Sequence, residues 1–127
     1  MTTNPALLAL ADEHFVSLTT YRKTGVGVST PVWVAREGDT LLITTPDDTG
    51  KVKRVRNNSR VTLSPSGRMG AVADGAPVVD GTATIEPETP PLTAIFARKY
   101  RLEYRIFMWI ERRGRAGQKP RVILRIS

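Results

Sequence analysis

The chain has 127 residues, of which 19 are Lys or Arg, 12 are Asp or Glu, one is His and none is Cys. This length predicts a single domain over residues 1–127, and the lack of cysteine excludes disulfides, thiolate metal sites and cysteine nucleophiles. His14 alone cannot form a two-histidine metal motif. The net charge of +7 favours an anionic partner, which can be nucleic acid, an acidic surface or a small molecule.

Targeting and membrane signals are missing from the sequence as given. No basic leader precedes a long apolar run, and no stretch approaches the roughly 18 apolar residues of a membrane helix. We therefore expect a cytoplasmic protein that does not enter a membrane.

The first third of the chain predicts a short helix and three strands. Asn4 is a suitable N-cap and Pro5 a suitable first helical residue for an apolar stretch that ends at Ala11. Tight glycine-containing turns then separate segments that are rich in Val, Thr and aromatic residues. These segments predict an antiparallel meander of three strands, at Phe15–Tyr21, Val26–Ala35 and Thr40–Thr45.

The rest of the chain predicts helices inserted between further strands. A short helix has Thr49 as its N-cap, runs to Asn58 and faces Val52 and Val55 inward. Another begins at Pro90, and a second helical piece covers 104–110 before a basic loop at 114–120. Strands are expected at Arg60–Ser64, at Val78–Glu86 and from Val122 to Ile126. The predicted fold is α+β but mainly β, a six-stranded antiparallel barrel with short helices, because barrel closure removes exposed sheet edges.

The helix that follows Thr49 is strongly basic and contains no acid. Its cations are Lys51, Lys53, Arg54 and Arg56. A cation in the first turn of a helix, such as Lys51, lies beside the positive end of the backbone dipole, which is unfavourable unless an anion joins them. The helix is therefore either a solvated basic face or a phosphate site. The hydroxyls of Thr44 and Thr45, which end the preceding strand, favour the phosphate site.

The segment from Ser29 to Trp33 contains a proline in the middle of a predicted strand. Pro31 cannot donate to a strand ladder, so it indicates an edge strand or a place where the backbone meets something other than a neighbouring strand. Trp33 then belongs either to the core or to a binding site. Gly25 and Gly27 lack the third glycine and the following helix of a dinucleotide-binding motif, so they indicate a hairpin turn.

Three segments together resemble a known family. TYRKTGVGVSTPVWV (20–34), GDTLLITT (38–45) and TGKVKRVRNNSRVTLSP (49–65) are similar to the pyridoxamine 5'-phosphate oxidase-like split barrels. Within that family they resemble the actinobacterial branch that binds the deazaflavin coenzyme F420 in place of FMN. The resemblance continues through VVDGTATIEP (78–87), ARKY (97–100) and the closing VILRI strand.

The resemblance implies a fold, an assembly and a cofactor site. The fold is the six-stranded FMN-binding split-barrel type, and the assembly is a homodimer with two cofactor sites at its interface. Thr30, Pro31, Val32 and Trp33 are implied to line the cofactor's ring system, next to Ser29. The phosphate is implied to meet Thr44, Thr45, Gly50 and Lys51, with Lys53, Arg54 and the more weakly matched Arg68 nearby.

The resemblance implies an F420-dependent oxidoreductase that transfers a hydride between the cofactor and a small organic substrate. The sequence shows no catalytic dyad, so we expect no side-chain nucleophile and no metal. Four clustered cations exceed what one phosphate requires and suit the carboxylates of the deazaflavin tail. An FMN-dependent oxidase or reductase and a non-catalytic cofactor-binding protein remain alternatives.

A nucleic-acid-binding module is a further alternative, but the basic helix has no aromatic residue for base stacking. A second set of cations near the C-terminus is interpreted as a solvated loop. Its members are Arg112, Arg113, Arg115, Lys119 and Arg121.

Overall fold

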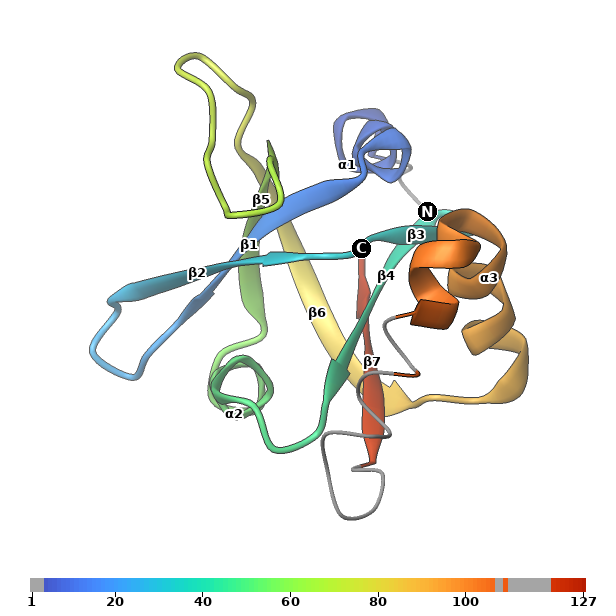
Figure 1. The fold of residues 1–127 in the computed structure, drawn as a ribbon. Helices are drawn as coiled ribbons and strands as arrows, with labels where there is room; N and C mark the ends of the chain where they lie inside the picture. Colours follow the sequence, from blue (N-terminus) through green and yellow to red (C-terminus); the bar gives the residue numbers. More distant parts are fainter. Residues whose placement is uncertain (1–3, 107–108, 110–119) are drawn as a thin grey trace.

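A computed structural model describes residues 4–106, 109 and 120–127 (Figure 1). It contains the helix α1 (Pro5–Ala9), the 3-10 turn η1 (Leu10–Asp12) and the helices α2 (Gly50–Asn57) and α3 (Pro90–Tyr100). The strands are β1 (Phe15–Tyr21), β2 (Gly27–Val32), β3 (Ala35–Glu37), β4 (Thr40–Pro46), β5 (Arg60–Ser66), β6 (Val79–Pro87) and β7 (Arg121–Ile126). Asn4 is the N-cap of α1, where its side chain accepts a hydrogen bond from the backbone N–H of Leu7.

The strands form one antiparallel sheet in the order β2-β1-β5-β6-β7-β4-β3. β6 joins its two halves, because residues 79–82 pair with β5 and residues 83–87 pair with β7. The expected count of six strands is wrong, since the described residues form seven in a sheet that does not close. The mainly β architecture with short helices is as expected.

The discrepancy arises at one place. The expected strand Val26–Ala35 breaks after Val32, so that β2 pairs with β1 while β3 pairs with β4 at the opposite edge of the sheet. The three-strand meander is therefore also wrong. At the break, the backbone of Val34 bonds to side chains of α3 instead of a neighbouring strand. Pro31 lies in an edge strand, one of the two situations that its sequence position indicates.

The core divides into two clusters on either side of the sheet. The larger one gathers residues such as Leu18, Leu63 and Ile126 together with α1 and α2. The smaller one places Leu42 and Ile123 against α3. This arrangement leaves helix α3 along one side of the sheet and α2 near the ends of β4 and β5 (Figure 1).

Helix α2 follows the expectation closely. Val52 and Val55 are 0% and 4% exposed, which anchors the helix on the core and leaves its cations on the other faces. Thr49 occupies the N-cap position, but its side chain makes no capping bond and its hydroxyl donates instead to the carbonyl of Pro46 at 3.0 Å. The first amides of α2 are therefore not capped by Thr49.

Helix α3 also matches, since Leu92, Phe96 and Tyr100 are buried. Residues 102–106 and 109 are helical, in agreement with the second expected helical piece. The rest of that piece, including Phe107, lies outside the described residues. So does the predicted basic loop up to Lys119, together with Arg112, Arg113 and Arg115.

Candidate functional site

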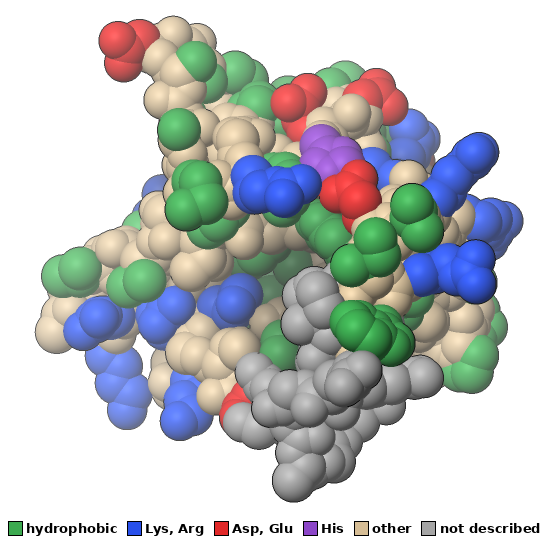
Figure 2. Space-filling model, viewed as in Figure 1, with side chains coloured by type: hydrophobic (Ala, Val, Ile, Leu, Met, Phe, Trp, Pro, Cys, Tyr) green, Lys and Arg blue, Asp and Glu red, His purple; other side chains and the backbone are tan. Residues whose placement is uncertain are grey.

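A cavity of about 560 Å³ opens between the end of β2 and the adjoining ends of β4 and β7. Figure 2 shows the surface hollowed near the centre of the view, with hydrophobic side chains inside the hollow and basic ones beside it. Its volume falls within the range of small-molecule sites. The lining residues are Phe15, Pro31, Val32, Trp33, Thr44, Thr45, Pro46, Lys51, Arg68, Glu103, Ile106 and Arg121.

Seven of the twelve site residues expected from the sequence line this cavity. They are Pro31, Val32, Trp33, Thr44, Thr45, Lys51 and Arg68. These residues come from β2, the chain that follows it, β4, α2 and the loop after β5. The fold therefore brings the proline-containing segment and the start of the basic helix to one cavity.

The other five expected residues do not line the cavity. Ser29 hydrogen-bonds to Thr19, with 2.6 Å between the hydroxyl oxygens, and Lys53 is exposed on α2. Arg54 donates from Nε to the hydroxyl of Thr20 at 2.6 Å and lies against Gly50. The remaining residue is Thr30, whose hydroxyl oxygen is buried and has no hydrogen-bond partner among the described residues.

One end of the cavity is positively charged. Lys51 is half-buried, and burial lowers its pKa, with further lowering from the positive charges of Arg54 and Arg121. The structure gives Lys51 no ion pair or hydrogen bond among the residues that it describes. A desolvated cation beside other cations is stabilised by an anion, so this end of the cavity suits a phosphate or carboxylate group.

The threonine hydroxyls at this end are already engaged. The hydroxyl of Thr44 donates to Glu88 at 2.5 Å and accepts from Nε of Arg121 at 3.2 Å. The hydroxyl of Thr45 lies 3.3 Å from that of Thr49, and Thr45 is almost fully buried. Thr44 therefore orients Arg121 at the cavity wall.

The opposite wall is aromatic. Trp33 stacks on Tyr100 with 4.3 Å between ring centroids and 12° between planes. Trp33 packs against the second core cluster and also lines the cavity. Of the two alternatives that the sequence left open for Trp33, its packing against the core is confirmed, and its role in a binding site stays a prediction.

The mouth of the cavity holds a small cluster of charged groups. Glu103 lies 2.9 Å from Nε2 of His14 and 3.8 Å from the guanidinium of Arg68. The Arg68 guanidinium also lies over the ring of Phe15, 5.9 Å from its centroid. These contacts join β1, the loop after β5 and the helical residues after α3.

Sequence reasoning missed five lining residues. They are Phe15, Pro46, Glu103, Ile106 and Arg121. The interpretation of Arg121 as part of a solvated loop is wrong, because it begins β7 and pairs with Pro46 in the sheet. Its alternation with the buried residues of β7 put it on the polar face, but only the strand pairing shows that this face borders Lys51.

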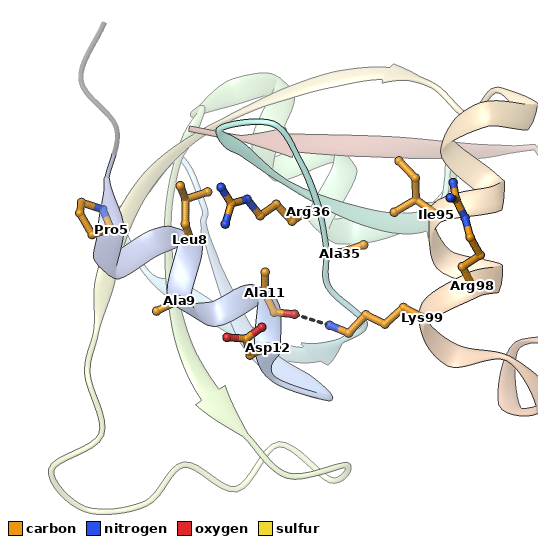
Figure 3. A pocket seen from close by; sticks show the side chains of 10 residues that line it. All are labelled: Pro5, Leu8, Ala9, Ala11, Asp12, Ala35, Arg36, Ile95, Arg98 and Lys99. Atoms are coloured by element: carbon orange, nitrogen blue, oxygen red, sulfur yellow. Dashed lines mark hydrogen bonds between the residues drawn. The ribbon is translucent and has the colours of Figure 1, made fainter.

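A second cavity of about 810 Å³ lies between α1, β3 and α3 (Figure 3). Its lining includes Leu8, Ala35, Arg36, Arg98 and Lys99 and none of the residues expected to bind a cofactor. Lys99 is bound to three backbone carbonyls, so its charge is used within the fold. We therefore take the smaller cavity as the candidate site.

The described residues contain no cluster of three potential metal ligands. Within the same part of the chain, we find no helix whose length and apolar character would let it cross a membrane.

Comparisons with known proteins agree with this architecture. The chain is similar in structure to an F420 reductase, with 22% identity, a TM-score of 0.61 and coverage of 97% of this chain and 93% of that one. It is also similar to the heme storage protein HutZ of Vibrio cholerae, with 10% identity, a TM-score of 0.65 and coverage of 100% and 90%.

A FAD-binding protein of Mesorhizobium loti matches with 15% identity, a TM-score of 0.56 and coverage of 99% and 87%. At these identities the likeness shows a common fold. No curated protein matches the chain. The family described as pyridoxamine 5'-phosphate oxidase matches residues 4–127, and the chain therefore belongs to this family.

Proposed function

We propose that this protein is a coenzyme F420-dependent oxidoreductase, which transfers a hydride between the deazaflavin and a small organic substrate. The observation that carries the proposal is the position of Lys51, a half-buried cation without an ion pair among the described residues, at one end of a cavity whose other wall is Trp33. A cofactor that carries an anionic group on a flat ring system could place the anion beside Lys51 and the ring against Trp33.

The residues of the cavity fit such a cofactor. Lys51 and Arg121 would hold its phosphate, and the Arg54 side chain, whose pKa is lowered by burial and by the charge of Arg22, extends the positive region. Pro31, Val32 and Trp33 would flank the ring system. The family membership and the likeness to an F420 reductase support this assignment.

The bound deazaflavin would supply the hydride chemistry, and the protein would supply binding, orientation and exclusion of water. Trp33 and Val32 would keep water from the reacting face. Lys51 and Arg121 would fix the position of the cofactor along the cavity.

A homodimer is part of the proposal. The cavity lies beside the edge strand β2, and Ile106, which lines it, is 49% exposed. Leu102, in the same helical segment as Ile106, is 65% exposed. A second copy that covered these residues would complete the wall of the cavity. The interface would also bury the free edge of β2.

FMN is the alternative cofactor, favoured by the likeness to a FAD-binding protein. A titration of the purified protein with each cofactor decides between the two. Coenzyme F420 should bind at micromolar concentration with a change in its fluorescence, and FMN should bind more weakly. Tighter binding of FMN would replace the proposal by its alternative, and binding of neither cofactor at low salt would overturn both.

A further inference from the structure

The chain crosses from β2 to β3 through Trp33 and Val34, at the place where the sheet is open. Neither residue belongs to a strand, so the backbone of Val34 has no ladder partner there. Val34 is nonetheless 0% exposed. Its buried polar backbone groups must therefore be satisfied by something other than the sheet.

The end of α3 satisfies them. The backbone N–H of Val34 donates to the hydroxyl oxygen of Tyr100 at 2.9 Å. The Tyr100 hydroxyl has one proton, which it can donate to the carbonyl of Val34 at 3.0 Å or to that of His14 at 2.9 Å. Burial raises the pKa of Tyr100 to about 12, so the hydroxyl keeps its proton at neutral pH.

Lys99 bonds to the same place. Its ammonium group donates to the carbonyls of Val34 at 2.5 Å and of Ala11 and Glu13, each at 2.7 Å. The bond to Ala11 is visible in Figure 3. A lysine has three N–H donors, and all three are used here. The end of α3 thus ties the turn before β1 to the crossing between β2 and β3.

The same tyrosine also holds the ring of Trp33. The two rings are stacked, 4.3 Å apart, and the hydroxyl anchors the backbone of the next residue, Val34. Two separate contacts with Tyr100 therefore help to hold the Trp33 ring, which also lies 6.3 Å from the ring of Tyr104. Since Trp33 is a wall of the cavity, a shift at Tyr100 moves that wall.

We infer that Tyr100 and Lys99 are positioning residues for the cavity, which act by fixing the crossing at Val34 and the ring of Trp33. Neither residue lines this cavity. The inference rests on the proposed function only for its effect on cofactor binding, because the position of Trp33 can be measured without a ligand.

The test uses Tyr100→Phe, which keeps the ring and removes the hydroxyl, and Lys99→Met, which keeps the side-chain length and removes the donors. Both are made in a Trp109→Phe background, because the chain has two tryptophans and Trp33 then reports alone. Acrylamide quenching and near-UV circular dichroism measure the exposure and the packing of Trp33. Titration measures the dissociation constant of coenzyme F420.

Both variants should increase the quenching of Trp33 and weaken its near-ultraviolet signal, and Tyr100→Phe should raise the dissociation constant about tenfold. Val61→Ala is the control, since it removes buried methyl groups from β5, where Val61 pairs with Thr20 and Gly81 and not with the strand that follows Val34. It should leave the Trp33 signals and the cofactor affinity unchanged.

Unchanged Trp33 signals in folded Tyr100→Phe would overturn the inference. If the parent protein binds no cofactor, the proposed function fails while the Trp33 signals still decide the role of Tyr100. Should neither variant fold, amide hydrogen exchange in the wild-type protein decides instead. The Val34 amide should exchange as slowly as the strand amides of β1, and rapid exchange would contradict the anchor.

Discussion

The strand β7 carries an arginine near each end of its polar face, and the two ends differ in how their positive charge is balanced. Arg125 donates to both carboxylate oxygens of Glu86, at 3.1 and 2.7 Å. It also forms an ion pair with Glu37 at 3.0 Å and donates to the hydroxyl of Thr40 at 2.9 Å. These contacts raise the pKa of Arg125 and lower that of Glu86.

At the other end, cations gather instead. Arg121 borders the cavity beside Lys51, and the charges of Arg121 and Arg54 help to lower the pKa of that lysine. The two cations, Arg125 and Lys51, therefore differ in whether a carboxylate of the protein neutralises them. At Arg125 the charge is neutralised by neighbouring carboxylates. Lys51 has no ion pair among the described residues, which is why we propose it as the group that binds an anion.

The largest effect should come from removing Arg125, whose charge is neutralised by Glu86 and Glu37. Arg125→Met leaves Glu86 and Glu37 without their shared partner, so we expect a loss of about 2 kcal/mol in the free energy of unfolding. Chemical denaturation measures this loss, and cofactor affinity should stay within about twofold of wild type. A variant as stable as wild type would show that Arg125 contributes nothing to the sheet.

Removing the charge of Lys51 should weaken cofactor binding and leave the stability of the protein unchanged. Lys51→Ala should raise the dissociation constant of the cofactor by about ten- to a hundredfold, since a hydrogen bond to a charged group contributes about 1.5–3 kcal/mol. The free energy of unfolding should not fall, because burying the charged Lys51 side chain without an ion pair is unfavourable in the wild-type protein. Lys53→Ala is the matched control, an exposed lysine on the same helix, and should leave the affinity nearly unchanged.

The smallest effect concerns pH. An anion binds the protonated form of Lys51, and burial makes this lysine lose its proton at a lower pH than an ordinary lysine, whose pKa is about 10.4. Cofactor affinity should therefore fall as the pH rises from neutral toward that value. In Lys51→Arg the fall should vanish, because arginine keeps its charge. The same fall in both proteins would assign the dependence to another group.

The sequence predicted the parts of the fold that local rules determine. β1 has the expected bounds, and Val52 and Val55 are buried as the helical spacing predicts. The break between β2 and β3 could not be predicted, because the alternating pattern continues through Trp33 and Val34. At the break, Val34 bonds to Tyr100 and Lys99, which lie more than sixty residues further along the chain.

The residues of the candidate site also divide into those that a local sequence pattern predicts and those that only the folded chain brings together. Lys51 could be singled out because a cation in the first turn of a helix breaks a local rule. Arg121 could not, since it reaches the cavity only through the pairing of β7 with β4. Glu103 comes to the mouth through the packing of the residues after α3, for which the sequence carries no local signal.

A crystal structure of the protein with coenzyme F420 tests the central claim most directly. The account predicts that the phosphate of the cofactor lies within hydrogen-bond distance of Nζ of Lys51 and beside Arg121, with the ring system against Trp33. A cofactor bound in the cavity lined by Leu8 and Arg36, or bound with Lys51 facing solvent, would contradict it.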